Sequence, residues 1–231
     1  MAKQKVIKNN KFKNALKIAA AALCAAAIVA IVIITGRQNA DKAEKTLNTT
    51  VMGTTASITV YGRNGSDIID DIMDLENNLD EKVISWRSDG SEVWNINHSY
   101  KAGEDYQISD ELADVLERTL EISEDNGDLL DITIRPLAEV WGIESGSTNV
   151  PFQTDIDAAL SAVDVTQVTC ISAKNSSDGK SYVNIAKEGM SLDFGAVGKG
   201  YGCDVAADYL EETSVTGACV ALGGSIMVYG S

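Results

Sequence analysis

The sequence contains a single histidine, His98, among 231 residues. This scarcity argues against zincin motifs, histidine-rich metal centres and most histidine-based catalytic triads, because the sequence does not supply the histidines that those sites require. His98 stands in the stretch Asn-Ile-Asn-His-Ser, which is typical of a loop. We therefore expect a solvated surface histidine rather than a ligand.

Cysteine and proline are also scarce, with four and two residues respectively. Cys170, Cys203 and Cys219 form no Cys-x-x-Cys pair, and three thiols allow at most one disulfide. We expect small core residues rather than metal ligands. With 45% hydrophobic and 23% charged residues, the composition excludes a disordered chain, a collagen and a disulfide-dense mini-protein, and it suffices for a hydrophobic core.

Basic residues are few: the sequence has 19 Lys and Arg against 34 Asp and Glu, which gives a formal net charge of −15. Residues 1–37 hold seven of the basic side chains and no acidic one, so the rest of the chain has 12 basic and 34 acidic residues, a net charge of −22. An acidic body of this kind repels phosphate backbones, so no nucleic-acid partner is expected.

An uncharged run of 19 residues, Ile18 to Gly36, separates Lys17 from Arg37. A helix rising about 1.5 Å per residue roughly matches the hydrocarbon core over this length. Because the basic side chains precede the run, the N-terminus is expected in the cytoplasm and the acidic body outside. We predict a single-pass protein of the cell membrane with a basic cytoplasmic N-terminus (1–17), a transmembrane anchor (18–36), a polar linker (37–48) and an extracytoplasmic domain (49–231).

Two alternatives to an uncleaved anchor are a cleaved signal peptide and a lipoprotein. A signal peptide usually has a shorter apolar core and small residues at its cleavage site, whereas this run is long and ends Ile-Val-Ile-Ile-Thr-Gly. A lipoprotein needs a small residue before its cysteine, but Leu23 precedes Cys24. The uncleaved anchor is therefore favoured.

Hydrophobic periodicity predicts helices and strands in mixed order over the remainder of the chain. Ser66 and Ser109 are predicted N-caps of two amphipathic helices, and Thr154 with Asp157 forms a capping box that opens a third. The predicted elements are a strand at 57–61, helices from Ser66 to Leu79, from Ser109 to Gly127 and from Thr154, strands at 168–172, 182–185 and 190–194, a helix at 196–212, and strands at 218–222 and from 225. This mixed order favours an α/β or α+β domain.

The most unusual stretch runs from Asp193 to Asp204 and contains four glycines around Lys199. It is not a phosphate-binding P-loop, because no glycine stands five residues before the Gly-Lys pair and no Ser or Thr follows it. An apolar strand ends in a carboxylate here, and glycines lead into a helix whose N-terminus and lysine suit an anion. The alternative is structural: the glycines allow tight packing of strand and helix.

This stretch resembles the signature of the ApbE family, the FAD:protein FMN transferases, in which a strand, an Asp, a glycine-rich turn, Lys-Gly-Tyr and a helix recur. Further segments resemble the family's motifs in the same order: Met52–Thr55, Ser85–Val93, Leu130–Leu137 with Val140–Gly142, and Val220–Gly224. The resemblance covers residues 49–231. It implies an α+β, mixed-sheet, T-fold-like catalytic domain that binds FAD.

The resemblance also implies where the flavin and the nucleotide lie. The flavin would stack against Trp86, which replaces the family's commoner tyrosine with a larger face, and Met52 would flank it. Leu129, Leu130 and Asp131 would line the nucleotide. The structural alternatives are a core aromatic for Trp86 and a cap or turn carboxylate for Asp131.

Asp193 and Lys199 are the catalytic residues that the resemblance implies. Asp193 would hold a polar edge of FAD, unless it is only a turn carboxylate, and Lys199 would approach the phosphates. The backbone carbonyl of Ala196 matches a ligand of a divalent metal, magnesium or manganese, which prefers oxygen. The family's other metal ligands lie in a later segment, and no Asp follows Asp208. We therefore expect a fragment of a longer protein with an incomplete catalytic domain.

The implied reaction is transfer of FMN from FAD to a Ser or Thr hydroxyl of a partner protein, with release of AMP. The acceptor would be a flavoprotein subunit of a membrane or extracytoplasmic redox complex. Positive charge from a metal, Lys199 and the helix N-terminus would offset the repulsion between an acidic domain and the pyrophosphate. Two alternatives are an exported FAD-binding protein without transferase activity and an FAD pyrophosphatase.

Overall fold

A computed structural model describes residue 19 and residues 22–36 and 43–230 of the chain. Residues 22–36 are helical. Over the described ranges, every helix is too short or too polar to cross a membrane. Residues 1–18, 20, 21 and 37–42 lie outside the described ranges. They include the expected basic N-terminus, three residues of the expected anchor and half of the expected linker, so the anchor stays a prediction. Residues 44–48, expected to belong to the linker, instead form part of the first strand.

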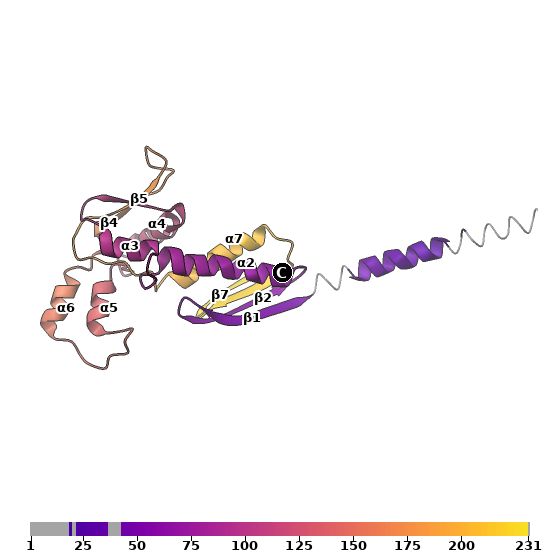
Figure 1. Cartoon of the computed structure of the whole chain (residues 1–231), viewed down its shortest axis with the longest axis horizontal. Coiled ribbons are helices and arrows are strands. Elements are labelled where there is room, and N and C mark those ends of the chain that lie inside the picture. Colours follow the sequence, from indigo (N-terminus) through magenta and orange to yellow (C-terminus); the bar gives the residue numbers. More distant parts are fainter. Residues whose placement is uncertain (1–18, 20–21, 37–42, 231) are drawn as a thin grey trace, which may run out of the picture.

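A four-stranded antiparallel sheet forms one half of the domain, with strand order β1-β2-β6-β7. Two helices, α2 and α7, cover one face of it (Figure 1). The buried residues Ile58, Val60, Ile72, Val220 and Leu222 belong to the core between the sheet and these helices. The bounds are β1 Glu44–Val51, β2 Thr54–Tyr61, α2 Gly65–Asn78, α7 Gly198–Glu211, β6 Gly217–Leu222 and β7 Ser225–Gly230.

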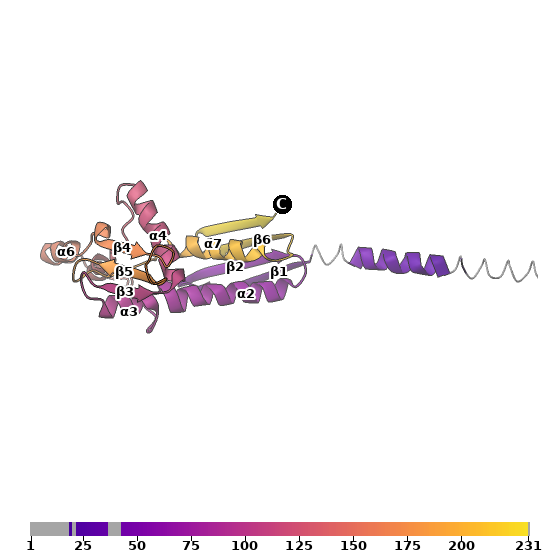
Figure 2. The same cartoon turned by 90° about the horizontal axis from the view of Figure 1, so that it is seen from above.

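A three-stranded antiparallel sheet of order β3-β5-β4 forms the other half. Helix α4 packs against β4 and β5, and a second core contains Leu79, Leu112, Leu116, Ile185 and Phe194. Figures 1 and 2 show the two sheets at opposite ends of the domain, and in Figure 1 α5 and α6 project away from the smaller one. The bounds are the π-helix η1 Leu79–Ile84, α3 Glu92–Ser99, β3 Asp105–Ile108, α4 Asp110–Asp125, α5 Arg135–Trp141, α6 Gln153–Leu160, the 3-10 helix η2 Val165–Gln167, β4 Val168–Ile171 and β5 Ser181–Ile185.

The α+β class is confirmed, and so is the helix predicted after Ser109. The Ser109 hydroxyl accepts the N–H of Leu112 at 3.0 Å, which satisfies one free donor of α4. The other two predicted caps are wrong. Asn64, in a left-handed conformation, holds the N-cap of α2 in place of Ser66, and α6 begins at Gln153 without a side-chain cap.

The strand predicted at 190–194 is also wrong, because this extended segment pairs with no strand. Its backbone is held by other groups: the N–H of Met190 donates to the Tyr100 hydroxyl at 2.9 Å, and the N–H of Asp193 donates to the carbonyl of Ile132 at 2.7 Å. Leu192 lies between them and bonds to a side chain of α3. The segment therefore reaches α7 fixed by helix and loop partners.

Candidate functional site

A two-residue turn between β1 and β2 presents Met52. Met52 and Gly53 both have positive φ, 50° and 67°, as the turn of a tight hairpin requires. The N–H of Met52 donates to Asp80 Oδ2 at 2.9 Å, which ties the turn to η1. A Cβ built on Gly53 would lie 3.4 Å from a terminal nitrogen of Arg87, an ordinary van der Waals contact, so this arginine lies directly against the turn.

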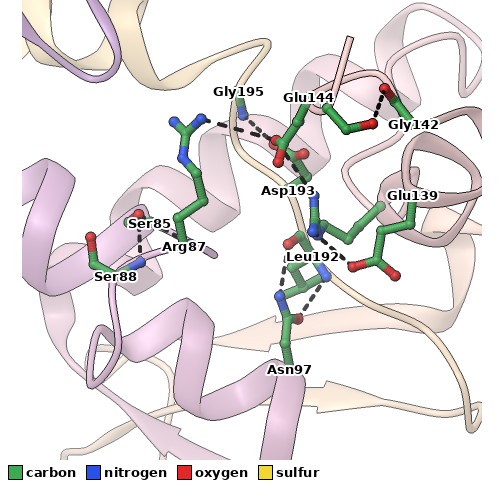
Figure 3. Close-up of polar contacts among 12 residues, drawn as sticks. Ser85, Arg87, Ser88, Asn97, Glu139, Gly142, Glu144, Leu192, Asp193 and Gly195 are labelled. Carbon is green, nitrogen blue, oxygen red and sulfur yellow. Dashed lines mark hydrogen bonds and ion pairs between the residues drawn. The ribbon is translucent and has the colours of Figure 1, made fainter. Parts of the chain in front are cut away.

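The loop from Ser85 to Ser91 carries Trp86 and Arg87 and is folded by its own serines. The Ser85 hydroxyl accepts the N–H groups of Arg87 at 3.2 Å and Ser88 at 3.1 Å, as Figure 3 shows. The Ser91 hydroxyl donates to the Ser85 carbonyl and caps α3 by accepting the N–H of Trp94. These bonds fix the backbone on either side of the Trp86 indole.

Arg135, at the start of α5, lies over the Trp86 ring. Its Cζ atom is 3.1 Å from the ring centroid, and that of Arg87 is 5.0 Å away. Arg135 is paired with Glu139 at 2.7 Å and with Glu144 at 3.5 Å. The side chain of Arg135 is only 11% exposed. A buried guanidinium with two carboxylate partners is strongly constrained, so Trp86 packs against a fixed cation.

The turn between Asp193 and α7 brings Lys199 to the same region. Asp193 Oδ1 accepts the N–H of Gly195 at 2.8 Å, and Lys199 Nζ donates to the Gly195 carbonyl at 3.0 Å. Among the described residues, no side chain caps the N-terminus of α7. A Cβ on Gly198 would come within 2.6 Å of Ile84 Cδ1, so glycine allows the helix to start against η1. The lysine and the N-terminal N–H groups together suit an anion.

Two cavities meet at Trp86 and Arg87. A narrow inner pocket of about 40 Å³ lies toward the Met52 turn and the start of α7. A wide groove of about 1120 Å³ lies on the side of α3 and α5. The inner pocket is lined by Met52, Asp80, Ile84, Ser85, Trp86, Arg87, Phe194, Gly195, Gly198 and Lys199. The structure thus gathers the predicted residues Met52, Trp86 and Lys199 around one space.

Leu129, Leu130 and Asp131 border neither of these two cavities. Leu129 is 87% exposed. The Asp131 carboxylate accepts the N–H and hydroxyl of Thr133 at 2.7 and 2.5 Å, and the N–H of Val165 at 3.1 Å. Asp131 therefore stabilises a turn, which is the structural alternative that the sequence analysis gave for it. A part for these three residues in nucleotide binding stays a prediction.

The groove is lined by residues that the sequence analysis did not assign to the site. His98 is exposed, as expected, but it lies on helix α3 and not in a loop. Its ring stacks on Trp94, with centroids 3.9 Å apart and planes at 23°. Arg135, Glu139 and Glu144 were also missed. The i, i+4 spacing of Trp94 with His98 and of Arg135 with Glu139 was the available signal, since such pairs share one face of a helix.

The buried carboxyl of Glu76 lies in α2 one turn before Asp80. It is 0% exposed, and its two oxygens have no hydrogen-bond partner among the described residues. Burial, with a smaller contribution from the charge of Asp80, raises its pKa to about 7. A Cβ on Gly202 of α7 would clash with this carboxyl. Glu76 thus fills the space between α2 and α7.

A metal site is not formed by the acidic, thiol and imidazole groups of the described ranges, which contain no cluster of three such residues. Ala196 is exposed in the turn before α7. Its carbonyl alone does not make a magnesium or manganese site, which needs several oxygen ligands.

Cys170, Cys203 and Cys219 form no disulfide, and burial raises the pKa of the Cys170 and Cys203 thiols, to about 12 and about 11.

Comparison with known proteins gives a consistent picture. The model of the ApbE family matches residues 52–231. Among curated proteins, the FAD:protein FMN transferase of Escherichia coli K12 is 25% identical over 149 residues, which are 64% of this chain and 41% of that protein. The protein of the same name from Treponema pallidum is 28% identical over 184 residues, 78% of this chain and 50% of that protein. The chain spans about half the length of such relatives.

Solved structures share the fold. The flavin transferase ApbE from Vibrio cholerae superposes with a TM-score of 0.71 at 23% identity, over 81% of this chain and 60% of that one. The ApbE protein from Thermotoga maritima gives a TM-score of 0.69 at 24% identity, over 80% and 59% of the two chains.

Proposed function

The chain belongs to the ApbE family, and we propose that it acts as an FAD:protein FMN transferase. The observation that supports this most directly is the convergence of Met52, Trp86 and Lys199 on one pocket beside the Asp193 turn. These residues come from three separate segments of the sequence, and each belongs to one of the motifs that resemble the family.

In the proposed complex the flavin of FAD stacks on Trp86 with Met52 beside it, and the pyrophosphate lies at the start of α7. The inner pocket of about 40 Å³ has room for little more than a water. Arg87 and Lys199 border it with long side chains, and Arg87 is 54% exposed on its side chain. Arg87 borders both cavities, so rotation of its side chain joins the pocket to the groove, which supplies the volume that a dinucleotide needs.

The reaction is attack of a Ser or Thr hydroxyl oxygen on the phosphorus next to riboflavin. The bond from that phosphorus to the AMP oxygen breaks, AMP leaves, and the hydroxyl proton passes to solvent. Lys199 and the uncapped N–H groups of α7 stabilise the negative charge that grows on the phosphates. Asp193 holds the turn through the N–H of Gly195, which keeps the carbonyl partner of Lys199 in place.

Dependence on magnesium or manganese is part of the proposal, with the carbonyl of Ala196 as one oxygen ligand. A bound ion would neutralise pyrophosphate charge. Since the described ranges supply no carboxylate cluster to complete the site, the roles of Lys199 and α7 are derived without it. Omitting and restoring the ion in the assay below tests this part separately.

The proposed setting is the outer face of the cell membrane, with residues 18–36 as a single-pass anchor. The support is the uncharged run between Lys17 and Arg37 and the lysines before it. The acceptor would be a flavoprotein subunit of a membrane or extracytoplasmic redox complex. Digestion with a protease tests the topology. The proposal requires that the domain be cleaved in cells whose membrane is intact and whose outer face the protease can reach, whereas cleavage only after lysis contradicts it.

The activity is tested by incubating the full-length protein with FAD, magnesium and an acceptor protein that carries a reactive threonine. A gain in acceptor mass equal to one FMN residue supports the transferase. Bound FAD without a mass change indicates a binding protein, and free FMN with AMP indicates a pyrophosphatase. Either of the last two results contradicts the proposed transfer.

A further inference from the structure

The two faces of the Trp86 ring have different surroundings. Arg135 borders the wide groove but not the inner pocket, whereas Met52 borders the inner pocket but not the groove. Trp86 borders both. The indole is therefore a partition, and the guanidinium of Arg135 covers it from the groove, with Cζ 3.1 Å from the ring centroid.

Arg135 is held in this position by groups other than Trp86. Glu139, one turn along α5, accepts from its Nη2 at 2.7 Å, and Glu144 lies 3.5 Å from Nη1. A planar guanidinium fixed by two carboxylates forms a rigid cover, which a flexible lysine could not provide.

We propose that Arg135 is a positioning residue that blocks the groove face of Trp86 and leaves only the face toward Met52 for the flavin. This inference rests on the proposed function. An uncovered indole offers two faces to a flat ring, and the groove face is the more accessible because the groove is far larger than the inner pocket. A flavin stacked on the groove face is on the opposite side of the partition from Lys199, so that complex is unproductive.

Unproductive binding has a specific kinetic signature. FAD bound in the wrong mode ties up enzyme, so kcat and the KM for FAD fall by the same factor while kcat/KM is unchanged. The equilibrium affinity for FAD rises by that factor, because a second mode has been added. A residue that only stabilises the fold gives a different result: loss of active protein lowers kcat alone, and a distorted site lowers kcat/KM.

The test uses the full-length protein and compares wild type with Arg135→Gln and Arg135→Lys. We expect Arg135→Gln to lower kcat and KM together by at least about threefold and to tighten FAD binding by the same factor, measured by fluorescence titration. Lys keeps the charge but not the planar cover, so Arg135→Lys should lie between Arg135→Gln and wild type.

Arg118→Gln is the matched control. Arg118 lies over another aromatic ring, that of Tyr201, with Cζ 5.7 Å from its centroid, and is paired with Asp114 at 3.0 Å and Asp204 at 3.6 Å. It borders neither cavity. Its replacement also removes one ring contact and two ion pairs, at a more exposed position (49% against 11% for Arg135), and should leave kcat, KM and FAD affinity unchanged.

If Arg135→Gln fails to fold, Glu139→Gln weakens the hold on Arg135 and should shift kcat and KM in the same direction by a smaller factor. Values for Arg135→Gln and Arg135→Lys equal to those of Arg118→Gln overturn the inference, and so does a fall in kcat/KM at constant KM. If wild type transfers no FMN, the proposed function fails first. Wild-type transfer with unaltered Arg135 variants refutes the positioning role alone.

Discussion

The side-chain amide of Asn97 pairs with the backbone of Leu192 much as a neighbouring strand would. Its Nδ2 donates to the Leu192 carbonyl at 2.9 Å, and its Oδ1 accepts the Leu192 N–H at 2.7 Å, as Figure 3 shows. Leu192 is fully buried and immediately precedes Asp193. Helix α3 thereby fixes the segment that leads into the site.

Replacing Asn97 by Ala should expose what this pairing contributes. Both backbone groups of Leu192 lose their partner, so we expect a loss of about 1–3 kcal/mol in the free energy of unfolding. Hydrogen exchange of the Leu192 amide should become faster, and it is measured by NMR. Asn95→Ala is the control on the same helix, since its Nδ2 makes one exposed bond to the Gly90 carbonyl at 3.2 Å. Equal protection of Leu192 in both variants would contradict the assignment.

Lys199→Ala should weaken FAD binding by about 10- to 100-fold, because hydrogen bonds from a charged donor contribute about 1.5–3 kcal/mol. The fold should change little, because the lysine makes a single exposed bond to the Gly195 carbonyl. Calorimetric titration with FAD measures the effect. Lys180→Ala is the control, since its Nζ also donates to a neutral oxygen, that of Gln107, at 3.2 Å, away from both cavities. Unchanged affinity in Lys199→Ala removes this lysine from the site.

Glu76 should make the protein less stable as the pH rises from about 4.5 to about 7. The unfolded chain ionises this carboxyl near the ordinary glutamate pKa of 4.5, whereas the folded protein keeps it neutral until about 7. Over this window the unfolded state loses its proton first, so unfolding becomes easier by about 3 kcal/mol in total. Glu76→Gln should remove this dependence and stabilise the protein at pH 7.

Urea denaturation at a series of pH values measures the Glu76 effect as the difference between wild type and Glu76→Gln. Other carboxyls titrate in both proteins and cancel in that difference. Glu81→Gln, at an exposed position in η1, is the control. A constant difference between wild type and Glu76→Gln across the window would show that the folded protein ionises Glu76 at the same pKa as the unfolded chain, which contradicts the raised pKa.

The glycines of α7 should differ in their tolerance of alanine. A Cβ at residue 202 meets the Glu76 carboxyl and lies 3.0 Å from Leu222 Cδ1, so Gly202→Ala should destabilise by about 1–3 kcal/mol. A Cβ at residue 200 meets nothing within 4 Å. Gly200→Ala should therefore stabilise the helix by about 0.5–1 kcal/mol. Thermal unfolding of the two variants gives the comparison, and equal shifts would contradict the packing described for α2 and α7.

Sequence reasoning succeeded where the determining contacts are local. The hydroxyl of Ser109 and the apolar stripe after it define α4 within one stretch, and both are as predicted. The segment at 190–194 was misassigned because its partners, Asn97 and Ile132, lie far away in the sequence. Its apolar pattern reflects burial, which does not distinguish a paired strand from a segment held by side chains.

The site was predicted only in part for a similar reason. Met52, Trp86 and Lys199 lie in motifs that resemble the family, so each was named before the structure placed them around one pocket. Arg135 was missed because its contact with Trp86 joins residues far apart in the sequence and depends on how α5 packs. The interaction that covers one face of the indole is therefore a tertiary feature.

A crystal structure of the full-length protein with FAD tests the central claim most directly. The account predicts the flavin on the Met52 side of Trp86, with the pyrophosphate between Gly195, Lys199 and the N-terminus of α7. A dinucleotide bound elsewhere, with the inner pocket still closed by Arg87 and Lys199, would contradict it.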